Sequence, residues 1–126
     1  MNLIIQIAIL FCWIKDNFIQ LIVNGQGENI PILGDNYGDS LPNEIFINNL
    51  PVSPAKKVNL SEEGDNIIKL KWESKVVNCY SMFRGCTSLL SVDLSNFDSS
   101  SINNVAYMFG STKLVKFINL TNFNPP

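Results

Sequence analysis

The chain has 126 residues, of which 46% are hydrophobic, and a formal net charge of −2. This length allows one domain at most, with a modest core, and the charge leaves no basic patch of the kind that nucleic acid requires. The sequence contains no histidine, which excludes Ser-His-Asp and Cys-His catalysis and every His-ligated zinc site. We therefore expect a protein that is not an enzyme and that uses no cofactor or metal.

An apolar run, Leu3–Ile14, opens the chain; it is interrupted only by Gln6 and is followed by Lys15 and Asp16. The run is shorter than the roughly 20 residues of a transmembrane helix, whereas its length suits the hydrophobic region of a secretory signal. No Lys or Arg precedes it, and no Ala-x-Ala cleavage site follows. The alternative is a buried strand or helix that belongs to the fold. We interpret residues 1–16 as a signal peptide.

Residues 17–75 contain short β patterns without a repeat of their own. Phe18–Val23 is rich in Ile and Val and precedes Asn24-Gly25, a strong hairpin signal. Asn29–Leu33 is therefore predicted as the returning strand, at an edge because of Pro31. Further strands are predicted at Glu44–Ile47, Val58–Leu60 and Ile67–Trp72, with a loop at Asn48–Pro54. We interpret this region as a β-rich N-terminal cap, in which Trp72 supplies buried surface at the junction with the following segment.

From residue 76 onward the chain repeats itself with a period of 26. Met82-Phe83 returns as Met108-Phe109, and Leu94-Ser95-Asn96-Phe97 returns as Leu120-Thr121-Asn122-Phe123. Such a period is typical of a solenoid, in which each repeat is one supersecondary unit stacked on its neighbour. Thr87-Ser88-Leu89 matches Thr112-Lys113-Leu114 at an offset of 25, so a one-residue slip is expected in a loop.

Each repeat combines two periodicities. Helical spacing is found in two apolar sets, Val76, Cys79, Met82 and Phe83 and then Ile102, Val105, Met108 and Phe109. Gly85 and Gly110 follow where a helix stop is expected, and Ser91–Ser95 alternates as a half-buried strand does. We expect helix, turn, strand and turn, with Val92, Leu94, Ile118 and Leu120 also pointing into the core. Ile68-Lys69-Leu70 is predicted as a third parallel strand; the alternative is that its apolar-x-Leu pattern belongs only to the edge of a β-hairpin.

The motif MFRGCTSLLSVDLSNFDSSSINNVAYMF resembles the 26-residue repeats of BspA-like leucine-rich repeat surface proteins. The resemblance covers Asn78–Phe123, with motif residues at Met82, Phe83, Cys86, Leu89, Leu94, Asn96 and Phe97. The second repeat departs from it, with Ser-Thr for Gly-Cys and Asn119 for Asp. The resemblance implies an α/β fold, a short leucine-rich-repeat solenoid of parallel strands and short helices in residues 76–126, behind the β-rich cap of residues 17–75. It also implies a secreted or surface protein, often an adhesin, with no catalytic residue to carry over.

Several polar or reactive residues are candidates for a site. Cys79 and Cys86 would remain after signal removal, either as a disulfide or, as we expect from the helical spacing of Cys79, as two reduced core thiols. Glycosylation sequons begin at Asn59 and Asn119. A calcium site from Asp35, Asn36 and Asp39 is conceivable, but its spacing matches no EF-hand loop, so no metal site is predicted.

The strand residues between the buried positions should form rows on the outer face of the predicted sheet. These rows are Lys69, Asp93 and Asn119; Lys71, Ser95 and Thr121; and Ser91 with Phe117. Such a face is the usual binding surface of stacked repeats. Its mixed charges and exposed Phe117 favour a protein or glycan partner over nucleic acid. The alternative is that these residues merely face water.

We therefore expect an extracellular or cell-surface module for protein or glycan binding or adhesion, related to the membrane only through secretion or surface display. Two alternatives remain open at this stage. One is an intracellular scaffold for protein–protein interaction, which would suit an apolar N-terminal run that belongs to the fold. The other is the N-terminal fragment of a longer surface repeat protein.

Overall fold

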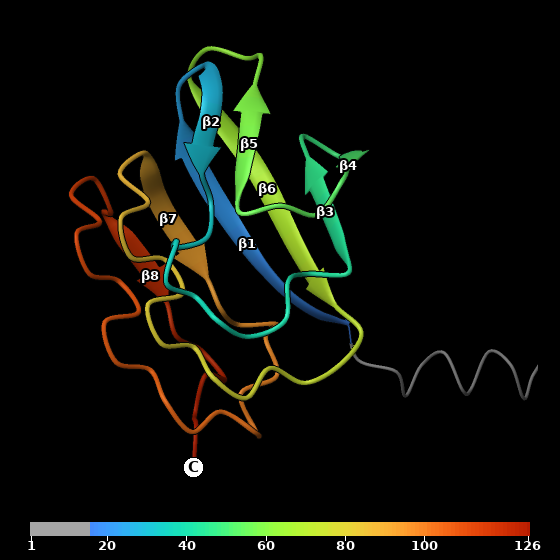
Figure 1. Cartoon of the computed structure of the whole chain (residues 1–126), viewed down its shortest axis with the longest axis vertical. Coiled ribbons are helices and arrows are strands. Elements are labelled where there is room, and N and C mark those ends of the chain that lie inside the picture. Colours follow the sequence, from blue (N-terminus) through green and yellow to red (C-terminus); the bar gives the residue numbers. More distant parts are fainter. Residues whose placement is uncertain (1–15) are drawn as a thin grey trace, which may run out of the picture.

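The computed structural model describes residues 16–126, so residues 1–15 of the predicted signal peptide lie outside the described part. The described residues form two β-sheets (Figure 1). The large sheet has the order β4-β3-β6-β1-β7-β8, and the small sheet pairs β2 with β5. The strands are β1 (Asn17–Asn24), β2 (Gly27–Pro31), β3 (Glu44–Ile47), β4 (Leu50–Val52), β5 (Lys57–Leu60), β6 (Asp65–Trp72), β7 (Leu89–Asp93) and β8 (Phe117–Asn119).

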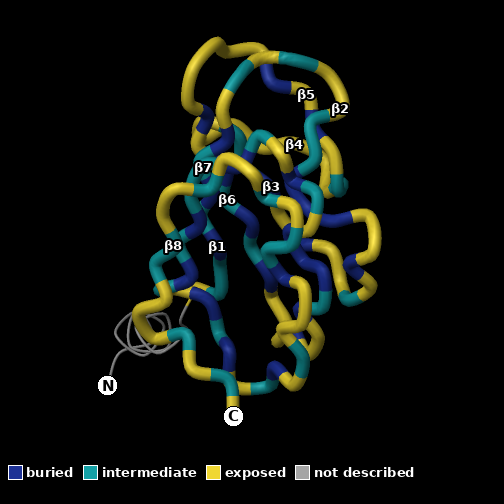
Figure 2. The backbone as a smooth tube through the Cα atoms, turned by 90° about the vertical axis from the view of Figure 1, so that its left-hand side faces the viewer, coloured by how far each residue is buried: buried dark blue, intermediate teal, exposed yellow. Residues whose placement is uncertain are grey.

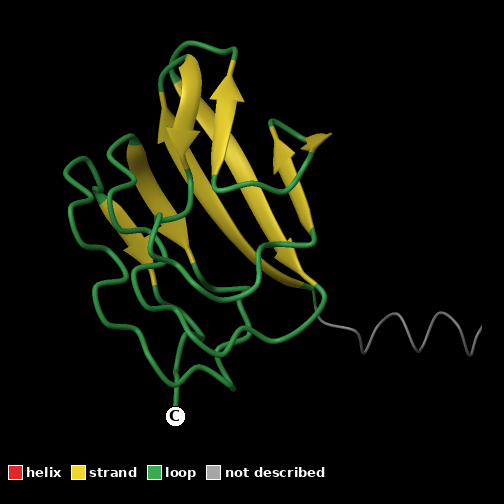
Figure 3. Cartoon of the chain, in the orientation of Figure 1, coloured by secondary structure: helices red, strands yellow, loops and turns green. Residues whose placement is uncertain are grey.

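The predicted α/β solenoid with short helices is wrong, because residues 16–126 contain no helix (Figure 3). In this part of the chain there is accordingly no helix long and apolar enough to cross a membrane. Residues 76–83 and 102–109 instead form turns: the Met82 amide donates to the Cys79 carbonyl, three residues earlier. Ser81 and Tyr107 each have a φ of 54°, which a right-handed helix does not accommodate.

Strand β1 lies at the centre of the large sheet and decides its topology. It pairs antiparallel with β6 along all eight residues, and on its other side with β7. The predicted β1–β2 hairpin is wrong, since β2 pairs with β5. The prediction of Ile68–Leu70 as a strand beside β7 is also wrong, because β1 separates β6 from β7. Strands β1 and β6 have equal length and both turn alternate apolar residues inward, so this pairing buries more apolar surface than the five-residue β2 could.

The predicted loop Asn48–Pro54 contains an additional strand, β4, which forms a hairpin with β3. Asn48 and Asn49 connect the two strands with φ values of 49° and 68°. Positive φ at both central residues is the requirement of a type I′ hairpin turn, and asparagine tolerates it. The sequence signal was therefore present in the Asn-Asn pair.

The two repeats, residues 76–101 and 102–126, lie side by side (Figure 1). Strands β7 and β8 pair in parallel, and the amides of Cys79, Ser81 and Phe83 donate to carbonyls of the second repeat at Asn104, Ala106 and Met108. The turns recur with an offset of 26 throughout: Leu89 N donates to Cys86 O, and Val115 N donates to Thr112 O. The predicted slip is therefore wrong. Val115, rather than Leu114, is the counterpart of Leu89.

The core lies between the large sheet and the loops that cover one of its faces (Figure 2). Of the residues predicted to point inward, Val92, Leu94, Met82, Phe83 and Met108 are buried. Phe109 and Ile118 are half-buried. Leu120 is 52% exposed, which contradicts its prediction, because nothing in the described chain packs beyond the second repeat.

The loop between β2 and β3 joins the N-terminal region to the first repeat. Trp72 is buried as predicted; its ring centroid lies 5.4 Å from that of Phe97, and its indole nitrogen donates to the Ser40 carbonyl. The Gly34 amide donates to the Met82 carbonyl at 2.7 Å. A Cβ atom at Gly34 would overlap the Ser81 carbonyl oxygen, so only glycine permits this close approach.

Candidate functional site

The face of the large sheet that points away from the core, here called the outer face, carries a row of residues on five adjacent strands. From β3 to β8, each residue of the row pairs with the next; in order they are Phe46, Lys69, Gln20, Asp93 and Asn119. All five side chains are partly exposed. Lys69, Asp93 and Asn119 thus lie in one row, as the sequence predicted, but Gln20 of β1 stands between the lysine and the aspartate.

The outer face carries more apolar residues than the sequence predicted, which was Phe117 alone. A second row joins Ile67, Ile22, Ser91 and Phe117, in which Ile67 is 49% and Phe117 is 63% exposed. A third row joins Glu44, Lys71 and Phe18. The Lys69 ammonium lies 4.0 Å from the centroid of the Phe18 ring, a cation–π distance.

Sequence reasoning missed every outer-face residue of β1 and β3, namely Phe18, Gln20, Ile22, Glu44 and Phe46. The alternation that reveals which residues of β1 face outward was visible in NFIQLIVN. What the pattern could not show is that β1 inserts between β6 and β7, because strand pairing is decided by contacts far apart in the chain.

Ser95 and Thr121, predicted on the outer face, follow the strands and belong to turns. The Ser95 amide donates to Asp93 Oδ1 at 2.9 Å, and the Thr121 amide donates to Asn119 Oδ1 at 3.0 Å. These two side-chain oxygens therefore hold equivalent Asx turns in the two repeats. Asp93 Oδ2 and the Asn119 amide nitrogen have no hydrogen-bond partner within residues 16–126, so they stay open to a ligand.

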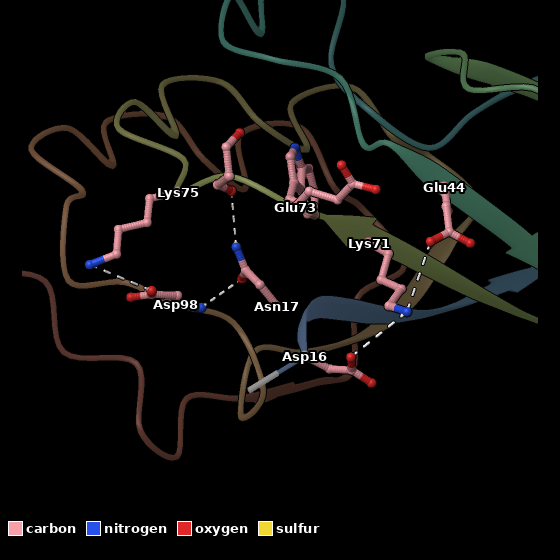
Figure 4. Close-up of a pocket in the computed structure, with 9 residues that line it drawn as sticks. Asp16, Asn17, Glu44, Lys71, Glu73, Lys75 and Asp98 are labelled. Atoms are coloured by element: carbon pink, nitrogen blue, oxygen red, sulfur yellow. Dashed lines mark hydrogen bonds and ion pairs between the residues drawn. The ribbon is translucent and has the colours of Figure 1, made fainter. Parts of the chain in front are cut away.

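Lys71, in the third row of the outer face, also borders a shallow pocket of about 360 Å³ (Figure 4). Its ammonium nitrogen is 3.7 Å from Asp16 Oδ1 and 3.9 Å from Glu44 Oε1. Lys75 is 3.9 Å from Asp98 Oδ2. Asn17 joins the two sides, since its side-chain amide donates to the Ser74 carbonyl and accepts from the Asp98 amide. These lysines already have carboxylate partners, so the pocket is a charged hollow that suits a polar group of a ligand.

The acidic residues of the conceivable calcium site serve the fold. Asp39 Oδ2 accepts hydrogen bonds from the amides of Val77 at 2.9 Å and Asn78 at 2.7 Å, and Oδ1 accepts from Ser40. Partial burial alone would raise the pKa of Asp39, but the hydrogen bonds from Ser40, Asn78 and Val77 outweigh it and lower the pKa. Asp35 forms an exposed ion pair with Lys57. No group of three metal-ligating residues occurs in the described part of the chain.

Cys79 and Cys86 are free and buried, which confirms the expectation of two core thiols. Burial raises the pKa of each thiol to about 12, with a smaller contribution from Asp39 for Cys79 and from Asp35 for Cys86. Neither thiol is therefore activated as a nucleophile.

Of the sequon asparagines, Asn59 is exposed on β5, where its side-chain oxygen accepts a hydrogen bond from the Asn29 amide. Asn119 is only partly exposed, and its side-chain oxygen belongs to the turn described above. Asn59 is thus the more accessible of the two. No family model, curated protein or solved structure matches this chain.

Proposed function

We propose that this chain is a non-catalytic binding module, secreted or displayed at a cell surface, that holds a protein partner on the outer face of its large sheet. The observation that carries the proposal is the composition of that face. Three phenylalanines, Phe18, Phe46 and Phe117, stand on separate strands between hydrogen-bonding side chains. A water-facing sheet surface has no need of such residues, whereas aromatic side chains are enriched at protein interfaces, where a few anchor residues supply most of the binding energy.

Charge supports a protein partner. The face carries Lys69 and Lys71 together with Asp93 and Glu44, so neither sign dominates it. Nucleic acid requires clustered Lys and Arg, whereas protein interfaces combine an apolar centre with a polar rim of both signs. The open Oδ2 of Asp93 and the amide of Asn119 provide such rim contacts.

Rigidity supports binding as well. Strands β1, β6 and β7 contribute residues to this face, and each of them is paired with a neighbouring strand on both sides. Little conformational entropy is therefore lost when a partner orders them. The likeness of the repeats to BspA-like surface proteins points in the same direction, and secretion accords with the apolar run Leu3–Ile14.

Binding is tested with Ile67→Ser combined with Phe117→Ser, two exposed apolar residues of one row. The labelled protein is applied to an array of extracellular-matrix proteins and to a glycan array. We expect the double variant to lose affinity for its protein ligand by about tenfold or more. Leu50→Ser is the matched control. Leu50 is 69% exposed, but it lies in one row with Ile47 and the buried Ile68 and therefore does not belong to the outer face.

Unchanged binding in a folded double variant, or a loss no larger than that of the control, would contradict binding on this face. Binding confined to the glycan array would replace the protein partner by a glycan. Secretion is tested separately by sequencing the N-terminus of the mature protein. A start near Lys15 or Asp16 is expected. An intact Met1 would contradict secretion by a cleaved signal and would favour the intracellular scaffold.

A further inference from the structure

A groove of about 520 Å³ lies at the edge of the large sheet that β4 forms. Within residues 16–126, β4 pairs only with β3 (Figure 1). One wall of the groove comes from the β3–β4 hairpin, and the other comes from the turn between β5 and β6. We call it the edge groove and define it by three apolar and three acidic residues: Ile47, Leu50, Val52, Glu62, Glu63 and Asp65.

The apolar wall of the edge groove is an extension of the core. Leu50 pairs with Ile47, and Ile47 pairs with Ile68, so the three residues lie in one row on the core-facing side of the sheet. Ile68 is fully buried, whereas Leu50 is 69% exposed. A second row leads from the buried Ile45 to Val52, which is 36% exposed. Apolar side chains therefore continue from the core into an open hollow, as they do in binding grooves.

The opposite wall carries negative charge alone. Glu62, Glu63 and Asp65 are exposed and line the groove, and no Lys or Arg lines it. None of the three carboxylates forms an ion pair or accepts a hydrogen bond within the part of the chain that the structure describes. These charges are therefore available to a cationic ligand.

A buried asparagine fixes the two walls relative to each other. The side-chain amide of Asn66 donates to the carbonyls of Gly25 at 3.0 Å and Glu62 at 3.2 Å. Its Oδ1 accepts from the Asn48 side-chain amide at 2.9 Å, and Asn48 Oδ1 accepts from the Ile67 amide at 2.9 Å. The hairpin and the acidic turn are thus held in place before a ligand arrives, which lowers the entropic cost of binding.

The backbone of β4 is unsuited to pairing with a further strand. Ile47 and Leu50 flank the two-residue turn and form its hydrogen-bonded pair, so the backbone groups of Pro51, the next residue, point to the open edge. Proline has no N–H to donate there, and proline at an edge opposes strand addition. A ligand of the edge groove is therefore held by side chains.

The arrangement of the carboxylates favours an extended cationic ligand over a single ion. No three metal-ligating side chains converge in the described residues. Several separate charges opposite an apolar wall suit a ligand that carries more than one cation on an apolar body. Lys and Arg beside an aliphatic residue have this character, because their methylene stems also cover apolar surface.

We propose that the edge groove binds a basic, partly apolar segment of a partner protein. An aliphatic side chain of the segment packs on Leu50 and Val52, while its Lys or Arg residues contact Glu62, Glu63 and Asp65. The apolar contact supplies burial, and the complementary charge selects the partner. The groove lies on the core-facing side of the sheet, away from the outer face, so this inference goes beyond the proposed function and does not depend on it.

The test is fluorescence polarisation with three labelled peptides of about ten residues, enough to span the groove. One alternates lysine with leucine, one glutamate with leucine, and one lysine with serine. The chain is produced without glycosylation, because Asn59 also lines the groove and a glycan there would cover it. We expect the lysine–leucine peptide to bind at least about tenfold more tightly than the other two.

Two variants remove the two halves of the groove. Leu50→Ser should weaken binding of the lysine–leucine peptide by about fivefold or more. Glu62→Gln combined with Glu63→Gln should weaken it by about tenfold and should reduce its dependence on salt. Both changes are at exposed positions, and circular dichroism confirms that each variant is folded.

Matched controls separate the groove from general effects. Asp35→Asn combined with Glu73→Gln removes the same charge from exposed carboxylates outside the groove, and Phe117→Ser removes an exposed apolar residue from the outer face. Both should leave peptide binding unchanged. An equal loss in the two charge variants would overturn the proposal. So would equal binding of the lysine–serine peptide, or no binding of any peptide up to about 1 mM.

Two further measurements address other occupants of the groove. Calcium or spermine that binds in titration calorimetry when the peptide does not, and that Glu62→Gln with Glu63→Gln abolishes, would replace the peptide by a small cation. Self-association in sedimentation equilibrium that Leu50→Ser abolishes would replace it by a second copy of the chain. Either result would overturn the proposal.

Discussion

The two repeats have the same local structure and different surroundings. Asx turns at Asn78 and Asn104 hold the amides of Tyr80 and Ala106, and positive φ recurs at Ser81 and Tyr107. Yet the first repeat lies between the N-terminal region and the second repeat, whereas within residues 16–126 the second repeat has a neighbour on one side only. Residues of equal type therefore differ in burial, as Leu94 and Leu120 do.

Comparing the two repeats separates the effect of local turn chemistry on the backbone from the effect of burial on stability. Local turn chemistry shapes the backbone of each repeat regardless of its neighbours. Stability comes instead from the apolar surface that neighbours remove from water. The same substitution made in each repeat should then leave the turns alike and change the free energy of unfolding unequally.

The largest contrast is expected for leucine truncation. Leu94→Ala removes a fully buried side chain and should lower the free energy of unfolding by about 2–5 kcal/mol, whereas the half-exposed Leu120 should cost about 1 kcal/mol or less when changed to Ala. Urea denaturation of both variants measures the difference. Equal losses would show that the burial contrast does not govern stability.

A smaller effect is expected at Asp39, which attaches only the first repeat to the N-terminal region. Its pKa lies below the ordinary value of 3.8, so the ionised carboxylate stabilises the fold above that value, and this contribution is lost as the pH falls through the lowered pKa. Asp39→Asn should destabilise by about 1 kcal/mol at neutral pH, and the deficit should shrink below pH 3.8.

Thermal unfolding of wild type and Asp39→Asn at neutral and acid pH provides the measurement. Asp35→Asn is the control, because the exposed ion pair of Asp35 with Lys57 contributes little. A deficit that stays constant with pH would show that hydrogen-bond geometry, and not the charge of Asp39, is responsible.

The smallest effect on stability is expected from a thiol in the second repeat. Val105→Cys places a cysteine at the counterpart of Cys79. It is made in a chain in which Cys12, the third cysteine of the sequence, is changed to Ser. The new thiol should react with an aromatic disulfide reagent at least about a hundredfold faster than Cys79 and Cys86, which require opening of the fold. Mass spectrometry assigns the modified position. Comparable rates at residues 79 and 105 would show that the second repeat is covered as fully as the first.

The sequence predicted the positions of the strands along the chain more accurately than it predicted which strands pair. Glu44–Ile47 was predicted with the bounds that β3 has, and β1, β5 and β6 were found within a residue or two. Alternation reports which residues share a face, and it does so locally. It does not report which strand lies alongside, so β1 was assigned to β2 in place of β6 and β7.

The helix prediction failed for a different reason. Cys79, Met82, Cys86 and Leu89 recur every three or four residues, as on a helix, but the spacing arises from successive turns closed by hydrogen bonds to the third preceding residue. A helix and a series of such turns both bring an apolar side chain to the same face every three or four residues. The positive φ of Ser81 and Tyr107 distinguishes the turns from a helix, but serine and tyrosine are not residue types that indicate a positive φ.

For the candidate site, the sequence identified Lys69, Asp93, Asn119 and Phe117 as one surface, and the register confirms that they share a face. By itself the sequence determined the repeat period, the alternation of apolar residues along β1 and β6 and the lack of histidine chemistry, since all of these depend on residue type and near neighbours. Only the tertiary structure decided that β1 divides that surface, that residues 16–126 form an all-β fold and that these residues cover the second repeat on one side only. Each of these depends on contacts between distant segments, whose free energy is settled by the whole set of competing pairings.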